Sequence, residues 1–286
     1  MIYHRCFRTL GLSAALLAVT MTAQPALSAK KTPELNTIAN YADLADLALN
    51  APVVVVGTIT RTIRLKAEDS PGIPPNHARF YVEAGVERLI SGRGPLPAAI
   101  NYVVDMPLDS RGRAMKFEGA RALLFLRPVP GRNDQYVLSG RDAQVGWTPE
   151  ADAKVKAILT EAQGPAGHLD ITGIGNAFHV AGTIPGESET QIFLTTKDGR
   201  PVSLSILRRP GEVPRWGVSL GDVVDESAQP AGHDTLLWYR LACFLPRQMP
   251  ASSLQRSQPA DQQAITQDYA FVLSQLGECS RPHQPG

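Results

Sequence analysis

The sequence predicts a mainly β fold with flanking helices: a small five-stranded barrel, then a second β-rich domain that ends in a disulfide-pinned helix. Between residues 53 and 139, five β-type runs alternate with turns rich in glycine and proline. Short strands at this spacing favour a barrel, because closure removes exposed sheet edges. Residues 177–209 carry a second set of alternating runs. An amphipathic helical pattern then precedes Cys279.

The elements of the barrel domain follow from changes in hydrophobic period. A short helix is expected over 37–50, and the first strand, 53–66, alternates after Gly57 with a slip that indicates a β-bulge. A closing helix begins at Thr148, a capping residue followed by proline and an acid, and runs to about Ala162. The other strands of this domain, which we place at 29–162, are 78–90, 98–105, 121–128 and 135–139.

A stretch rich in glycine, 163–167, is the predicted domain boundary, so the second domain spans 163–286. Its strongest hairpin signal is the turn Asp198-Gly199 between two alternating runs. Its predicted strands are 177–184, 190–196 and 201–209, with short strands at 216–220 and 222–225. Two helices follow, one over 236–245 and one whose apolar face carries Ile265, Tyr269, Val272, Leu273 and Leu276.

Residues 1–28 have the composition of a cleavable secretory signal. Arg5 and Arg8 precede an uncharged apolar run, 9–21, and Ala26 and Ser28 place small residues where a signal peptidase cleaves. The apolar run is too short to cross a bilayer as a stable helix. We therefore expect a periplasmic or secreted protein that is not an integral membrane protein after cleavage.

Charge and cysteine content agree with export. The signal removes two of the 28 basic side chains and none of the 27 acidic ones, so the mature chain lacks the basic surplus that nucleic-acid binding requires. Cys6 leaves with the signal, and Cys243 and Cys279 remain. In an oxidising compartment this pair predicts one structural disulfide, worth roughly 4 kcal/mol for a loop of this length.

Three segments give residues 53–139 a family resemblance. A valine-rich strand runs into glycine (VVVVGTI), a long strand ends in a glycine turn (VEAGVERLISGRG), and an apolar strand precedes a tyrosine-bearing one (ARALLFLRPVPGRNDQYVL). In this order of parts the region resembles the OB-type barrel of netrin-like modules, which are related to tissue inhibitors of metalloproteinases. The resemblance implies an OB-like barrel and a protease-inhibitor-like activity. Those inhibitors act through an N-terminal cysteine, and the predicted mature N-terminus has none.

One motif suggests catalysis. Gly217 to Gly221 matches the Gly-x-Ser-x-Gly pattern of serine hydrolases with Ser219 as nucleophile, and Asp225 and His233 follow in the order of a triad. The pattern requires a strand, a sharp turn and a helix, whereas the residues after Gly221 leave no room for a helix. We therefore favour glycines at a strand edge, and keep a serine hydrolase as a second alternative.

Metal and cofactor sites are not predicted. The mature histidines lack the spacing of zinc ligands, and the acidic residues lack the spacing of a calcium loop. A solvated acidic surface and structural histidines are the favoured interpretations. The histidines in question are His77, His168, His179 and His233, and the acids are Glu187, Glu189, Asp222, Asp225 and Glu226.

The leading hypothesis is a non-enzymatic binding or assembly module of the cell envelope, whose partner is an unidentified envelope protein or a glycan. It rests on the lack of any convergent set of acid, base, nucleophile and metal ligand. The alternatives are a protease-inhibitor-like module and a serine hydrolase. Basic residues that suggest a face for an anionic glycan, or else a solvated strand, are Arg61, Arg64, Lys66, Arg111, Arg113 and Lys116.

Overall fold

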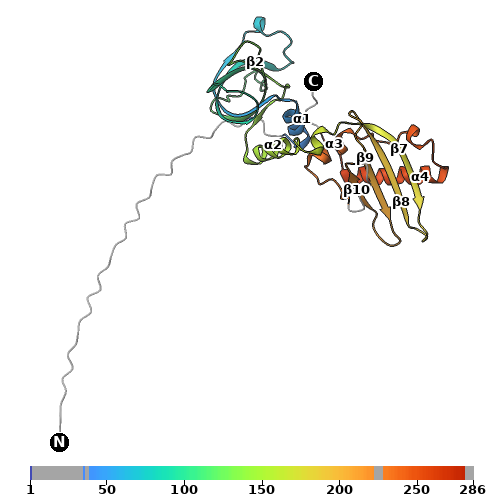
Figure 1. The fold of residues 1–286 in the computed structure, drawn as a ribbon. Helices are drawn as coiled ribbons and strands as arrows, with labels where there is room; N and C mark the ends of the chain where they lie inside the picture. The colour runs from blue at the N-terminus through green and yellow to red at the C-terminus, as the bar shows by residue number, and fades with distance from the viewer. Residues whose placement is uncertain (2–34, 36–38, 222–227, 281–286) are drawn as a thin grey trace. The chain divides into compact units, whose positions relative to one another are not determined.

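A computed structural model describes residues 1, 35, 39–221 and 228–280 (Figure 1). Apart from its first residue, the predicted secretory signal lies outside the described part, and so does the predicted strand over 222–225. Among the helices of the described residues, none combines the length and the apolar composition needed to cross a membrane.

The described residues form a mainly β fold with four α-helices, which confirms the predicted fold class. One sheet curves into a nearly closed barrel of five strands, and a four-stranded sheet follows it in the chain (Figure 1). The last helix is tied to the preceding helix by a disulfide.

The barrel strands have the order β3-β2-β1-β4-β5. Strand β1 is antiparallel to β2 on one side and to β4 on the other. Between β3 and β5, Asn101 forms a parallel bridge with Gln135, and the Asn101 amide donates to the Asp134 carbonyl oxygen at 2.8 Å. The bounds are Val53–Arg64 (β1), His77–Ser91 (β2), Ala99–Pro107 (β3), Arg121–Pro128 (β4) and Tyr136–Leu138 (β5), and a short strand β6, Gln144–Gly146, also pairs with β4.

Strand β1 begins with four valines because this part of the strand is buried on both faces. Val53 and Val55 belong to the barrel core, whereas Val54 and Val56 pack into a second hydrophobic cluster. A continuous apolar run, instead of an alternating one, is the expected pattern for a strand covered on both sides.

The register between β1 and β2 shifts at three points, the last of them between Ile59 and Arg61. The slip in the sequence pattern is therefore a series of β-bulges, which bend and twist a strand and help a sheet to curve. Gly57 lies at the second shift, where an added side chain would stand 3.0 Å from the Gly85 carbonyl oxygen. Glycine allows this close approach of β1 and β2.

Side-chain caps set the starts of the first two helices. The Asn40 side chain accepts a hydrogen bond from the Asp43 amide at 2.9 Å, and the Asp43 carboxylate accepts one from the Asn40 amide. This capping box starts the first helix one residue after Asn40, later than predicted. The second helix starts as predicted, with the Thr148 hydroxyl accepting from the Ala151 amide at 3.1 Å. The helices are Tyr41–Asn50 (α1) and Pro149–Glu161 (α2).

The second sheet is an antiparallel meander in the order β10-β9-β8-β7. The predicted hairpin between β8 and β9 is present, with Gly199 at a φ of 75°. The prediction for β7 was wrong at its start, because Gly173 and Gly175 lie beside register shifts that keep the strand paired with β8. The bounds are Ile171–Ala181 (β7), Ser188–Thr196 (β8), Val202–Arg208 (β9) and Arg215–Ser219 (β10).

Helix α4, Pro259–Leu276, lies across one face of this sheet (Figure 1). Its buried side chains share a hydrophobic cluster with strand residues such as Ile192 and Leu204. The predicted amphipathic face is confirmed for Ile265, Tyr269, Val272 and Leu276, whereas Leu273 is only partly buried.

A buried carboxylate ties α4 to the strands beneath it. Asp268 is 1% exposed and accepts hydrogen bonds from the Thr190 hydroxyl of β8 and the Arg208 guanidinium of β9, each at 2.5 Å. Thr190 is also within hydrogen-bonding distance, 2.8 Å, of His179 Nδ1 on β7. A buried charge is tolerated where it is paired and hydrogen-bonded in this way.

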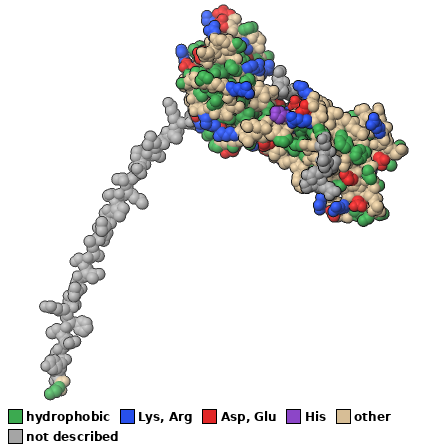
Figure 2. All heavy atoms as spheres, viewed as in Figure 1, with side chains coloured by type: hydrophobic (Ala, Val, Ile, Leu, Met, Phe, Trp, Pro, Cys, Tyr) green, Lys and Arg blue, Asp and Glu red, His purple; other side chains and the backbone are tan. Residues whose placement is uncertain are grey.

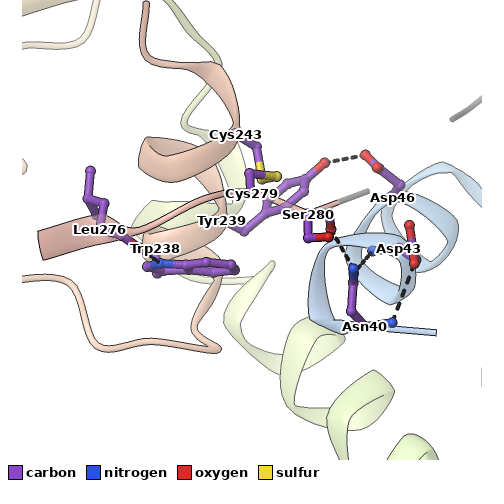
Figure 3. The surroundings of a disulfide bond; sticks show 9 residues. All are labelled: Asn40, Asp43, Asp46, Trp238, Tyr239, Cys243, Leu276, Cys279 and Ser280. Atoms are coloured by element: carbon purple, nitrogen blue, oxygen red, sulfur yellow. Dashed lines mark hydrogen bonds between the residues drawn. A yellow bond between two sulfur atoms is a disulfide. The ribbon is translucent and has the colours of Figure 1, made fainter. Parts of the chain in front are cut away.

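The predicted disulfide joins Cys243 and Cys279 with an S–S distance of 2.02 Å (Figure 3). Cys243 lies on helix α3, Leu236–Phe244, and Cys279 follows α4. Next to the disulfide, the Trp238 indole donates to the Leu276 carbonyl oxygen at 2.8 Å. The segment after α4 also contacts α1, because the Asn40 side chain donates to the Ser280 carbonyl oxygen.

Replacing the buried carboxylate should destabilise the fold strongly. Asp268→Asn removes the charged partner of Arg208, whose side chain is 36% exposed, so we expect a loss of about 2 kcal/mol in the free energy of unfolding. Urea unfolding followed by circular dichroism measures the change. The control is Asp261→Asn in the first turn of α4, which should cost about 0.5 kcal/mol. Equal effects of the two substitutions would contradict this account of Asp268.

Candidate functional site

Three neighbouring barrel strands present a row of apolar side chains on their outer face. The register pairs Ile63 of β1 with Tyr81 of β2, and Tyr81 with Val103 of β3. Ile63 is 40% exposed and Val103 is 42% exposed, and Tyr81 is half-buried between them. We call these three residues the outer row.

Strand alternation explains why the outer row faces outward. Successive side chains of a strand point to opposite faces, and Phe80 and Val82, which flank Tyr81 in β2, are buried in the barrel core. The two neighbours of Val103 in β3 are buried in the same way. The barrel core therefore places Tyr81 and Val103 outside.

An ion pair borders the outer row on one side. The Arg79 guanidinium donates to both carboxylate oxygens of Asp105, at 2.7 and 2.9 Å, and to the Pro71 carbonyl oxygen at 3.1 Å. These hydrogen bonds from Arg79 hold the pKa of Asp105 below its ordinary value. The pair is largely shielded from water, since the side chains are 22% and 17% exposed.

Polar side chains border the other side. Arg61, Glu83 and Asn101 pair across the same three strands, and the Asn101 side chain donates to the Asp134 carboxylate at 3.0 Å. The outer face of β1, β2 and β3 thus has an apolar centre between two polar borders.

The sequence pattern did not identify the outer row, because its members come from three strands and meet only through the register. The available signal was Tyr81, an aromatic residue at an outward position of an alternating strand. Pairing partners cannot be deduced from the period of one strand, since a slip of one residue exchanges the two faces.

The predicted basic face is interrupted by acids. The Glu118 carboxylate accepts hydrogen bonds from the amide and the hydroxyl of Thr62, both at 2.9 Å. These hydrogen bonds lower the pKa of Glu118, and the nearby charges of Lys116 and Arg61 lower it further. Arg113 pairs with Asp109 at 3.0 Å and Lys66 with Glu68 at 3.2 Å. Figure 2 likewise shows acidic and basic side chains interspersed over the face in view. This arrangement favours an anionic glycan less than the sequence alone does.

Ser219 lies at the end of β10, paired with Ser203, and is 5% exposed. The nucleophile of a serine hydrolase instead stands exposed on a strained turn between strand and helix. The His233 imidazole contacts Asp234 at 3.1 Å and stacks on Trp238 with ring centroids 4.2 Å apart. Asp225 lies outside the described residues. This geometry gives the hydrolase hypothesis little support.

The other candidate ligands are dispersed. His77 Nδ1 lies 2.8 Å from the Pro75 carbonyl oxygen, and His168 ends the short 3₁₀-helix η2, Pro165–His168. Glu189 accepts a hydrogen bond from Gln191. The part of the chain that the structure describes contains no group of three or more histidine, cysteine, aspartate and glutamate side chains placed to hold a metal ion. Asp222 and Glu226 lie outside that part.

Comparison with known proteins adds no family: neither a scan against protein-family models nor a search of curated proteins finds a match to this chain.

The Arg79–Asp105 pair predicts a specific acid sensitivity of the barrel. Because the pKa of Asp105 is lowered in the folded state, the pair stabilises the fold at pH values above roughly 4, the ordinary aspartate pKa. This stabilisation is lost as the pH falls through the lowered value. Between pH 6 and pH 2.5, the wild type should therefore lose about 1–2 kcal/mol more than Asp105→Asn. Urea unfolding at each pH measures both losses, and equal losses would contradict the assignment.

Proposed function

We propose that this chain is an exported, non-enzymatic binding module that docks a protein partner on the outer face of its barrel. The observation that supports this proposal is the outer row. It places an aromatic side chain between two exposed aliphatic ones, Ile63 and Val103, within polar borders. Protein interfaces have this anatomy of an apolar centre and a polar rim, and tyrosine is enriched among their energetically dominant residues.

The chemistry of the face supports a protein partner over a glycan. Three of the five border residues already have side-chain partners: Arg79 and Asp105 pair with each other, and Asn101 pairs with Asp134. A glycan is recognised chiefly through polar groups that are available to its hydroxyls, whereas a protein surface gains most by covering the apolar centre. Burying Ile63 and Val103 removes apolar surface from water.

The strand order supports an OB-like barrel. The sequence of neighbours β3-β2-β1-β4-β5 and the parallel bridge from Asn101 to Gln135 are those expected of that barrel. Barrels of this type bind ligands on the face of their second and third strands, where Tyr81 and Val103 lie. Because fold similarity alone carries no function, the proposal continues to rest on the exposed side chains of the outer row. Protease inhibition stays a prediction of the resemblance, and becomes the special case in which the partner is a protease.

Export is proposed on two grounds. Residues 1–28 have the composition of a secretory signal, and the Cys243–Cys279 disulfide is of a kind that persists in oxidising compartments. The module therefore meets its partner in the periplasm or outside the cell.

Site-specific photo-crosslinking tests the proposal. The photoreactive residue p-benzoylphenylalanine replaces Tyr81 in the full chain, which is expressed in its own cells and irradiated. We expect one protein adduct, identified by mass spectrometry. The control carries the same group at Val137, which is 54% exposed on β5 of the same barrel, and should give no such adduct. Adducts at neither position, or the same adducts at both, would contradict docking at the outer row.

Charge placed in the outer row should weaken binding of the partner and leave folding intact. Val103→Arg puts a guanidinium in the apolar centre, so we expect affinity for the crosslinked partner to fall at least about tenfold. Val137→Arg makes the same change at an exposed valine outside the row and should leave affinity unchanged. Surface plasmon resonance measures both affinities, and thermal unfolding verifies both folds. Full affinity of Val103→Arg would exclude the outer row.

A further inference from the structure

Strands β7 and β8 present side chains on the face of the second sheet that lies opposite α4. Ala177 of β7 and Leu194 of β8 point to the α4 side, where they are buried in the same hydrophobic cluster as Ile265 of the helix. Successive side chains of a strand point to opposite faces, so the neighbours of Ala177 and Leu194 point away from α4. We call these neighbours the Phe178 face: Asn176, Phe178, Phe193 and Thr195.

Two phenylalanine rings form the apolar part of the Phe178 face. The register pairs Phe178 with Gln191 and Asn176 with Phe193, which makes the two phenylalanines diagonal neighbours on adjacent strands. Their ring centroids are 5.6 Å apart, and the ring planes differ by 36°. Phe178 is 40% exposed, and Phe193 is half-buried. The pair therefore offers an aromatic surface that extends over both strands.

The polar groups of the Phe178 face are available to a ligand. Within the described part of the chain, the Asn176 side chain has no hydrogen-bond partner, and its amide offers two donor protons and an acceptor oxygen. The Thr172 hydroxyl donates to Thr195 Oγ1 at 3.0 Å, so the Thr195 hydroxyl keeps its own proton for another acceptor. Uncharged donors and acceptors thus lie beside the aromatic rings.

Two glycines leave space around the Thr195 hydroxyl. Gly173 and Gly175 lie at the two register shifts of β7. A side chain at Gly173 would stand 3.3 Å from Thr195 Oγ1, and one at Gly175 would stand 3.3 Å from the Thr195 methyl group. Glycine inside a strand marks a bulge or a place that another group approaches closely. Here the bulges keep Thr195 exposed and its hydroxyl open.

This surface carries very little charge. Neither β7 nor β8 contains a lysine or an arginine. His179 of β7 points to the α4 side, where its Nδ1 lies 2.8 Å from the hydroxyl of the buried Thr190. Glu189, the one acid of the two strands, pairs with Val180 beyond Phe178. An anionic ligand would meet a carboxylate here without a strand cation to offset it, so an uncharged polar ligand suits the surface best.

We infer that the Phe178 face binds a neutral oligosaccharide. A sugar ring has one face of C–H groups, which packs on the electron-rich face of an aromatic ring, and a rim of hydroxyls that donate and accept hydrogen bonds. Phe178 and Phe193 supply the aromatic surface, while Asn176 and Thr195 supply donors and acceptors. From Asn176 to Val180 the strand extends about 13 Å, which is longer than one sugar ring. The site shares no residue with the outer row of the barrel.

Titration of the purified, disulfide-intact mature chain with neutral hexasaccharides tests the inference. The neutral probes are chitohexaose, cellohexaose, maltohexaose and mannohexaose, and hexagalacturonate is the anionic comparison. Isothermal titration calorimetry measures each affinity. We expect at least one neutral probe to bind and hexagalacturonate to bind more weakly, because its carboxylates find no cation on β7 or β8.

Two variants with matched controls locate the binding site. Phe178→Ala should weaken binding at least about tenfold, because it removes the exposed ring. Its control is Phe244→Ala, which truncates a phenylalanine of similar exposure, 39%, on α3 and should leave affinity unchanged. Asn176→Asp removes the amide donors and should weaken binding about fivefold. Its control is Asn133→Asp at an exposed residue between β4 and β5. Thermal unfolding verifies each fold.

Several results would overturn the inference. They are the binding of no neutral probe, equal affinity for hexagalacturonate and the best neutral probe, and wild-type affinity of either Phe178→Ala or Asn176→Asp. A dimer of the purified chain that Phe178→Ala converts to a monomer in analytical ultracentrifugation would assign the face to a second copy instead. The barrel variant Val103→Arg should bind the oligosaccharide with full affinity, so failure of this site and failure of the outer row are separable.

Discussion

The register of β1 is the constraint on which the barrel and its proposed binding face depend. Strand β1 pairs with β4 in an unbroken register and with β2 through three register shifts, so its pairing sets the position of both neighbours. A shift of one residue between β1 and β2 would exchange the faces of the strand and remove Ile63 from Tyr81. Burial of Val53 to Val56 on both sides holds the start of β1 in place, because any slip there would expose core side chains. The outer row is a consequence of this packing.

In the second sheet, long-range contacts hold the C-terminal segment in place. Asp268 fixes α4 across one face through Thr190 and Arg208, and the disulfide fixes the segment that follows α4.

Features encoded locally were predicted from the sequence, and features created by pairing were not. Thr148 as a helix start and the face of α4 with Ile265 and Tyr269 depend on residues near one another in the chain, and the structure confirms them. The start of β7 was misplaced because Gly173 and Gly175 resemble strand breakers until their bulges against β8 are known. The outer row arises where three strands meet, which no periodicity within one strand reveals.

The most direct measurement is hydroxyl-radical footprinting of the chain in its native envelope and after purification. Docking on the barrel predicts that Tyr81 is oxidised several-fold more slowly in the envelope, while Met115, which is 52% exposed in a loop of the same barrel, reacts at the same rate in both preparations. Equal oxidation of Tyr81 in the envelope and in the purified protein would contradict the claim that a partner covers the outer row.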